Sequence, residues 1–134
     1  MTWLYENTEF TLDEASEYVG FVYLITNLTN GKKYIGKKLF NFTRTKKVKG
    51  KTRRKKVRKQ SDWISYWGSN ANLIADVKAI GEENFKREIL HLCKSKGTCN
   101  YLEMYEQVVR NALTSDDFYN EQIHVRVHRS HIKL

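Results

Sequence analysis

Two tyrosines, Tyr23 and Tyr34, have types and spacing that could support chemistry. They flank a turn: Phe21–Ile25 is an apolar run rich in β-branched and aromatic residues, and Leu28–Gly31 joins it to a return strand. With a four-residue loop, both phenols project from one face of the hairpin as diagonal neighbours, roughly 7–8 Å apart. Tyr23 then lies opposite Gly36, which leaves room for a ligand backbone. A two-residue Asn30-Gly31 turn gives a different register but keeps both phenols on one face. Two phenols and a gap on one face indicate a functional site.

A carboxylate on a predicted helix is the second candidate. Asn100 and Glu103 have the spacing of a capping box, which predicts a helix from Tyr101 to about Leu113. The predicted inner stripe of this helix consists of Leu102, Tyr105, Val109 and Ala112. Glu106 lies about 40° from that stripe's first residue, so its carboxylate either extends to solvent or faces a polar site beside the core. We expect Glu103 to be the cap.

A dense run of cations lies between these two candidates. Residues 43–59 hold eleven of the 24 Lys and Arg residues and no acid, within a chain of net charge +9. Like charges at this density repel, so we expect a cationic insert at 43–60 that stays mobile without a polyanion. A solvated loop and a nuclear-import signal are alternatives, and a nucleic-acid-binding arm is favoured. The predicted DNA contacts are Lys33, Lys38, Lys46, Lys47, Lys49, Lys51, Arg53, Arg54, Lys55, Lys56, Arg58 and Lys59.

The hairpin resembles the signature of the GIY-YIG nuclease family. Phe21-Val22-Tyr23 stands in place of the first Gly-Ile-Tyr, and Tyr34-Ile35-Gly36 is an intact second element. The resemblance extends from Gly20 to Asn120. It implies a catalytic arginine at Arg44, ten residues after Tyr34, and a metal-binding glutamate at Glu106. It also implies that Gly36 and Asn120 support the site.

This resemblance implies a metal-dependent DNA endonuclease that nicks or cuts double-stranded DNA. One Mg²⁺ or Mn²⁺ ion at Glu106 would neutralise charge and assist the leaving oxygen. Arg44 would bind a non-bridging phosphate oxygen, Tyr23 would act as general base if nearby cations lower its pKa, and Tyr34 would orient the water or phosphate. The alternative is a catalytically inactive nucleic-acid-binding module of the same fold.

Two departures from the family pattern affect these roles. The histidine that some members carry four residues after the arginine is Val48 here, so water activation rests on Tyr23. The insert can also shift the alignment, which leaves Arg53, Arg54 and Arg58 as alternatives to Arg44.

These residues must be positioned by strands and helices. The sequence pattern predicts an α/β (α+β) fold with a small three-stranded antiparallel sheet flanked by helices. Phe85–Cys93 is the expected third strand, and a helix begins near Ser69 and ends at Gly81. Thr11 is expected to cap a short helix through Tyr18. We expect a single domain over residues 1–134, with a short C-terminal tail from about residue 121.

The composition limits the cellular location that we expect for the protein. The chain has no proline, no long apolar run and no leading basic-then-apolar segment, so we expect an intracellular, cytoplasmic protein without a membrane contact, in the host cytoplasm if phage-encoded. Cys93 and Cys99 are expected to be reduced thiols rather than zinc ligands. Double-stranded DNA is the expected partner, and a targeting protein is a further candidate.

Overall fold

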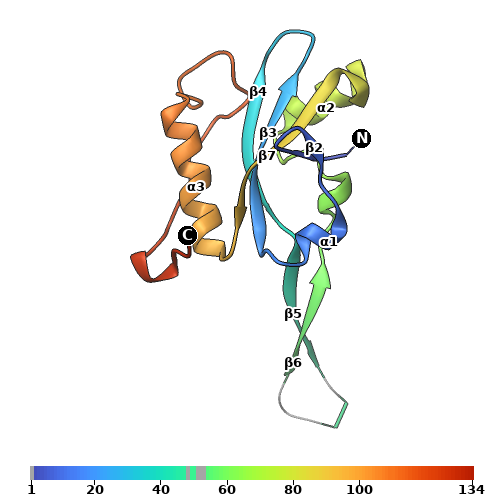
Figure 1. Ribbon diagram of the computed structural model, residues 1–134, viewed down its shortest axis with the longest axis vertical. Helices are drawn as coiled ribbons and strands as arrows, with labels where there is room; N and C mark the ends of the chain where they lie inside the picture. The colour runs from blue at the N-terminus through green and yellow to red at the C-terminus, as the bar shows by residue number, and fades with distance from the viewer. Residues whose placement is uncertain (1, 48, 51–53) are drawn as a thin grey trace.

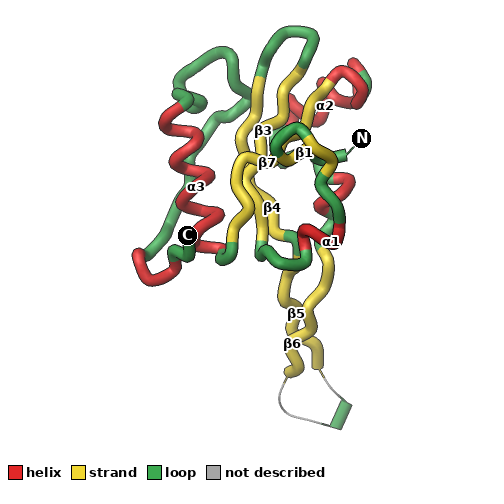
Figure 2. The backbone as a smooth tube through the Cα atoms, in the orientation of Figure 1, coloured by secondary structure: helices red, strands yellow, loops and turns green. Residues whose placement is uncertain are grey.

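The computed structural model describes residues 2–47, 49–50 and 54–134, and its main feature is a five-stranded sheet (Figures 1 and 2). The strand order is β2-β1-β7-β3-β4. The strands are β1 (Leu4–Tyr5), β2 (Thr8–Glu9), β3 (Gly20–Asn27), β4 (Lys33–Leu39) and β7 (Phe85–Cys93). The three antiparallel strands β7, β3 and β4 form the predicted sheet, and β7 has the predicted bounds.

The prediction of three strands was wrong because the N-terminal segment joins the sheet. β1 pairs in parallel with β7, and β2 pairs antiparallel with β1 through a tight turn in which Glu6 and Asn7 have positive φ. Trp3 anchors this segment: it is 1% exposed, and its Nε1 donates to the carbonyl of Trp63 at 2.7 Å. A two-residue strand carries too little periodicity to be recognised in the sequence.

The hairpin of β3 and β4 has the predicted register. Tyr23 pairs with Gly36 and Ile25 with Tyr34. The Asn27 amide nitrogen donates to the carbonyl of Lys32 at 2.8 Å, which closes the four-residue turn, and Gly31 takes a φ of 75°. Gly31 therefore has the left-handed conformation that a turn at this position needs.

Helices cover both faces of the sheet (Figure 1). They are α1 (Leu12–Ala15), η1 (Trp63–Ser65), α2 (Ala71–Ile80), η2 (Glu82–Asn84), α3 (Lys96–Val109) and η3 (Arg129–His131). Thr11 caps α1 and Gly81 ends α2, as predicted, although α1 stops short of Tyr18. The predicted start of α3 was wrong: Ser95 is its N-cap, with its hydroxyl accepting from the Thr98 amide.

The core is divided by the sheet. The α2 side contains most of the aromatic residues, including Trp3, Phe21, Tyr23, Phe40, Trp63 and Tyr119. The α3 side is smaller and contains Val22, Leu24, Ile35, Cys93, Cys99 and Ala112. Neighbouring residues of a strand point to opposite faces of the sheet. Tyr23 on β3 packs on the α2 side, and Ile35 on β4, next to the Gly36 that pairs with Tyr23, packs on the α3 side.

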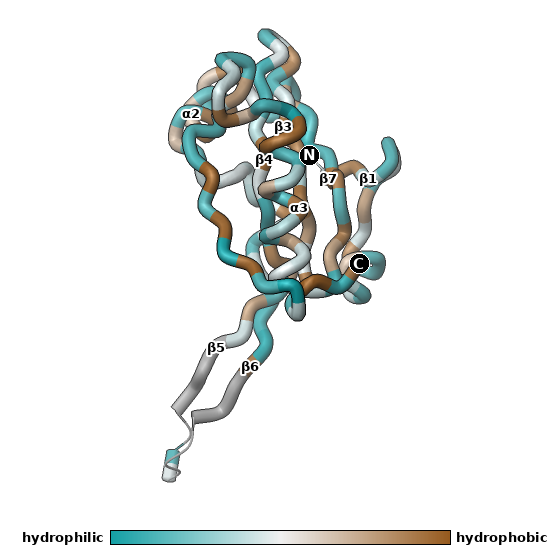
Figure 3. The backbone as a smooth tube through the Cα atoms, turned by 90° about the vertical axis from the view of Figure 1, so that its left-hand side faces the viewer, coloured by the Kyte–Doolittle hydropathy of each residue, from teal (hydrophilic) through white to brown (hydrophobic). Residues whose placement is uncertain are grey.

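The basic insert forms a second hairpin, which projects away from the main sheet (Figures 1 and 3). β5 (Asn41–Lys47) pairs antiparallel with β6 (Arg54–Gln60), and Arg44 lies opposite Val57. The expected mobility of the insert stays a prediction, and the described backbone of β5 and β6 is paired. Thr43, Thr45 and Val57 are β-branched residues, which favour paired strands. Val48, Lys51 and Arg53 lie outside the described residues.

The C-terminal segment is an extended strap, and it returns to α3. Ile123, Val125 and Val127 are half-buried, whereas the residues between them are exposed; Figure 3 shows this alternation in hydropathy near the C-terminus. The Ser95 hydroxyl donates to the carbonyl of His131, which lies where a β-carbon on Gly97 would stand. Within the described residues, no helix is long and apolar enough to cross a membrane.

Candidate active site

The free edge of β4 is covered by polar groups instead of another strand. The Lys33 amide donates to the Asp117 carbonyl at 2.9 Å, and the Tyr119 amide donates to the Lys33 carbonyl at 2.7 Å. Farther along, the Asn120 side chain accepts from the Ile35 amide at 3.0 Å and donates to the Ile35 carbonyl at 2.8 Å. These bonds satisfy the edge groups that β3 cannot reach.

Farther along the same edge of β4, Lys37 lies beside an acidic residue of α3, Glu103. The backbone amide of Lys37 interacts with the Glu103 carboxylate. Burial raises the pKa of Glu103 above its ordinary value, while the charge and the amide of Lys37 act in the opposite direction. Glu103 is thus a partly desolvated carboxylate with only limited compensation, which makes it a strong candidate for binding a cation.

An open polar cleft lies beside this edge and contains Glu103. Its volume is about 510 Å³. Its lining residues are Tyr34, Ser69, Asn70, Ala71, Glu103, Gln107, Asn120, Glu121, Gln122 and His124. Tyr34 and Glu103 therefore face one space from two different elements, β4 and α3. The cleft can take a polar, charged ligand.

The two tyrosines differ in their access to this cleft. Their ring centroids are 6.2 Å apart, so the predicted pairing on one face is present. Tyr34 is half-buried, lines the cleft and shares a 3.2 Å hydrogen bond with Ser69 Oγ. Tyr23 is 1% exposed and hydrogen-bonds Tyr66, whose ring centroid is 6.1 Å away.

Burial raises the pKa of both tyrosines. Desolvation is the largest cause for each, and the negative charge of Glu103 adds to it. Burial thus acts against the lowered pKa that a general-base role for Tyr23 would need, and that role stays a prediction.

The space beside Gly36 is filled by protein. A β-carbon on Gly36 would lie well inside 3.0 Å of the Tyr23 hydroxyl, so the ring of Tyr23 occupies the gap that the sequence suggested for a ligand backbone. Gly68 has a similar place between the tyrosines, with Tyr34 and Tyr23 atoms 3.1 and 3.3 Å from its virtual β-carbon.

Glu106 points from α3 toward His91 on β7 and not into the cleft. It is 8% exposed, and its two oxygens accept from His91 Nε2 and Arg110 Nε, each at 2.8 Å. Burial would raise its pKa, but the hydrogen bonds and charges of Arg110 and His91 outweigh burial and lower it. Among the described residues, Glu106 is absent from the cleft lining. The structure therefore brings Glu103, not Glu106, to the tyrosines.

The helical-wheel prediction failed because one side of α3 packs on the polar edge of β4. Gln107 is 5% exposed and donates to the Ile35 carbonyl at 3.4 Å, whereas Tyr105 and Val109 are 46% and 54% exposed. Glu103 and Gln107 thus lie over β4, and Glu106 and Arg110 lie toward His91 on β7.

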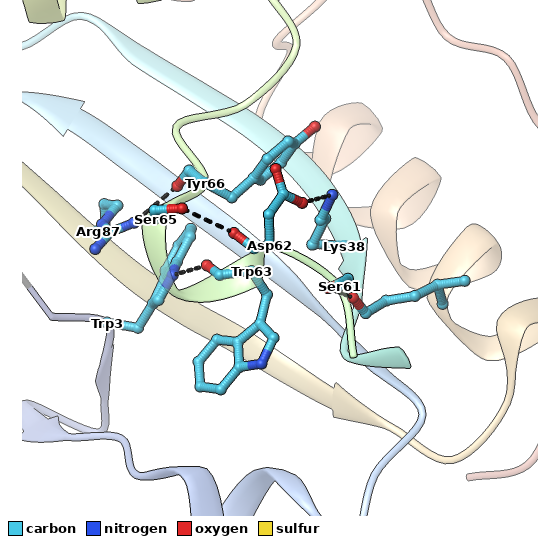
Figure 4. Close-up of polar contacts among 9 residues, drawn as sticks. Trp3, Lys38, Ser61, Asp62, Trp63, Ser65, Tyr66 and Arg87 are labelled. Atoms are coloured by element: carbon cyan, nitrogen blue, oxygen red, sulfur yellow. Dashed lines mark hydrogen bonds and ion pairs between the residues drawn. The ribbon is translucent and has the colours of Figure 1, made fainter. Parts of the chain in front are cut away.

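The cations predicted to bind DNA differ in how they are engaged. Lys38 forms a 2.7 Å ion pair with Asp62 and lies 4.0 Å above the ring of Tyr66 (Figure 4). Lys33 Nζ donates to the Gly31 carbonyl at 3.2 Å. Lys49, Arg58 and Lys59 are exposed. The side chains of Arg44, Lys46, Lys47, Arg54, Lys55 and Lys56 lie outside the described part.

Sequence reasoning missed a buried cation behind the tyrosines. Arg87 is 3% exposed, with its guanidinium 4.5 Å from the Trp3 ring and 4.4 Å from the Trp67 ring. Its Nη1 donates to the Tyr66 carbonyl at 2.7 Å (Figure 4), and burial lowers its pKa to about 10. Arg87 holds the segment that carries Tyr66. An arginine within an apolar strand was the available signal.

The donor set for a metal is small. Within the described part of the chain, no three His, Cys, Asp or Glu side chains form a group that could hold a metal ion. Glu103 and Glu121 are the carboxylates among the described residues that line this open polar cleft. That arrangement fits a hard divalent cation such as Mg²⁺, which keeps most of its waters and needs one or two carboxylates plus phosphate oxygens.

Comparison with known proteins identifies a family. A family model described as "Putative endonuclease segE, GIY-YIG domain" matches residues 3–123. No curated protein and no solved structure matches the chain. The matched range contains both tyrosines, the basic hairpin, α3 and Asn120.

Proposed function

Since the chain belongs to the GIY-YIG endonuclease family, whose substrate is nucleic acid, we propose that it is a metal-dependent endonuclease hydrolysing double-stranded DNA at the cleft beside β4. The observation that carries this proposal is that Tyr34 and Glu103 line the same polar cleft, one from the signature strand and one from α3.

Glu103 is the metal ligand in this proposal, in place of Glu106. Both oxygens of Glu106 are engaged by His91 and Arg110, whereas Glu103 faces the cleft with one backbone partner. One Mg²⁺ or Mn²⁺ ion bound there would supply charge neutralisation and assistance to the leaving oxygen.

Tyr34 is the phenol that meets the substrate. Its hydroxyl lines the cleft and stays protonated, so it can donate a hydrogen bond to a phosphate oxygen or hold the attacking water. Tyr23 is a positioning residue, because its buried ring packs against Tyr34 and its hydroxyl bonds Tyr66.

The basic hairpin supplies phosphate contacts and the arginine. Arg44 lies on β5 opposite Val57, midway along the seven backbone pairs of the hairpin. A guanidinium is a permanent cation with a fork that matches two phosphate oxygens. The remaining lysines and arginines would hold the DNA backbone and position it without reading its sequence.

A matched pair of substitutions tests this proposal. Wild-type protein, Glu103→Gln and Glu106→Gln are incubated with supercoiled plasmid and Mg²⁺ or Mn²⁺, and DNA affinity is measured separately without metal. We expect Glu103→Gln to lose at least about a hundredfold in cleavage rate with unchanged DNA affinity. Glu106→Gln should retain cleavage below its melting temperature.

Two results would contradict it. Loss of cleavage in Glu106→Gln with full activity in Glu103→Gln would return the metal to position 106. Absence of cleavage by the wild-type protein with every divalent metal, together with intact DNA binding, would favour a catalytically inactive nucleic-acid-binding module.

A further inference from the structure

A second cavity lies next to the cleft, between the root of the basic hairpin and the start of α3. Its volume is about 450 Å³. Its lining residues are Lys37, Lys38, Leu39, Phe42, Ser61, Lys96, Cys99 and Asn100. Asn100 lines this cavity and Glu103 lines the cleft, and three residues of an α-helix rise by roughly 4.5 Å. The two spaces are therefore neighbours along β4 and α3.

The walls of this cavity combine an aromatic ring, an apolar floor and a cationic rim. Phe42, the second residue of β5, is 39% exposed although it is aromatic. Leu39 and Cys99 contribute apolar atoms, and three lysines, Lys37, Lys38 and Lys96, lie around them. An apolar floor is a poor site for a free phosphate, whereas a flat aromatic surface beside cations suits a nucleotide base and its backbone.

The hairpin root that carries Phe42 is fixed in place. The Ser61 hydroxyl donates to the Leu39 carbonyl, and the Lys38–Asp62 ion pair lies beside it (Figure 4). Phe42 is paired with Lys59, the last pair but one before the chain leaves the hairpin. The backbone that carries Phe42 is thus held at the root of the hairpin by these contacts and by its pairing with Lys59.

We propose that this cavity receives the unstacked base of a nucleotide adjacent to the scissile phosphate, with Phe42 as its stacking partner. The inference rests on the proposed function, because the neighbouring cleft is taken as the phosphate site. Lys96 and Lys37 would hold the flanking phosphates, and the Asn100 amide, which contacts Lys37 Nζ in the free protein, would reach a base edge.

Unstacking has a cost that makes the proposal measurable. Extruding a base from a paired duplex costs a few kcal/mol, and the cost is smallest at a mismatch. A protein that stacks an extruded base should therefore bind a mismatched duplex more tightly than the paired duplex of the same sequence. A protein that contacts only the backbone should bind both alike.

The experiment measures binding without cleavage. The full chain, kept metal-free with a chelator, is titrated into a short duplex with 2-aminopurine at one position, either paired or mismatched. We expect wild-type protein to bind the mismatched duplex about tenfold more tightly and to change the 2-aminopurine fluorescence. Phe42→Ala should abolish this preference, with a larger loss of affinity for the mismatched duplex than for the paired duplex. Phe42→Trp should restore the preference.

Tyr105→Ala is the matched control, because Tyr105 is an exposed aromatic residue on α3 outside the cavity lining. It should keep the preference. Equal preferences in Phe42→Ala and wild type, or none in wild type, would overturn the base site. Failure of the proposed function looks different: the wild-type protein would then fail to cleave plasmid, whatever its preference for mismatched DNA.

Discussion

The ring of Tyr23 occupies the space that a side chain on Gly36 would need. Even a methyl group at position 36 would lie well inside 3.0 Å of the Tyr23 hydroxyl and within 3.1 Å of the ring. Packing thus explains why a glycine on β4 lies opposite a tyrosine on β3: without a side chain at Gly36, there is room for the whole ring of Tyr23.

Replacing Gly36 should therefore displace Tyr23. We expect Gly36→Ala to lower the free energy of unfolding by about 1–3 kcal/mol through overpacking, and to reduce cleavage because Tyr34 packs on the displaced ring. Denaturant unfolding of Gly36→Ala, Tyr23→Phe and the double variant gives the coupling. Removing the hydroxyl relieves the nearest contact, so the double variant should be more stable than the sum of the single effects predicts. Strict additivity would contradict this packing relationship.

The Glu106 network should contribute to stability and not to cleavage. We expect Glu106→Gln to lose about 1–2 kcal/mol of unfolding free energy at neutral pH, because His91 and Arg110 lose a charged acceptor and both are partly exposed. The control is Glu103→Gln on the same helix, which should unfold close to wild type.

The pH dependence of this loss follows from the sign of the shift. The pKa of Glu106 in the folded protein lies below the ordinary 4.5, so the folded state binds fewer protons than the unfolded state near that pH. Its contribution is complete above about pH 4.5 and disappears as the pH falls through the folded pKa. The stability difference between wild type and Glu106→Gln should accordingly shrink on acidification. A difference that grows at acid pH would reverse the assignment.

Glu103 should set the acid limb of cleavage. Its pKa is raised above 4.5, so its carboxylate takes up a proton at a higher pH than an ordinary glutamate, and activity should fall there. Lys37 lowers this pKa, so Lys37→Met should move the acid limb to higher pH. Single-turnover rates at saturating protein across mildly acidic pH measure the shift. Lys33→Met, at the other end of β4, is the control and should leave the limb in place.

The basic hairpin should account for much of the salt dependence of DNA binding. Because Phe42 pairs with Lys59, residues 43–58 can be replaced by a short Asn-Gly turn without altering the main sheet. The slope of log affinity against log salt should flatten by about 0.9 for each phosphate that the shortened protein no longer neutralises. A hairpin of full length with glutamine at its basic positions should behave alike if charge is responsible. An unchanged slope would place the phosphate-binding residues elsewhere.

The sequence predicted the elements whose signals are local. The four-residue turn Leu28–Gly31 predicted the register of Tyr23 and Tyr34, and β7 was predicted with the bounds Phe85–Cys93. It did not predict which acid meets the tyrosines, because that depends on how α3 rotates against β4. Burying Gln107 and exposing Val109 contradicts the hydrophobic pattern, and the Ile35 carbonyl at the edge of β4 explains it, because Gln107 donates to that carbonyl.

The side chains that cover the edge of β4 also hinder self-association of the protein. An open strand edge is a template on which another copy could add its own strand, and Asn120 blocks that template by occupying both backbone groups of Ile35. The same residue borders the cleft. Asn120 therefore both prevents strand addition at the edge of β4 and forms part of the cleft. A substitution of Asn120 should cause self-association of the protein before it causes a loss of cleavage activity.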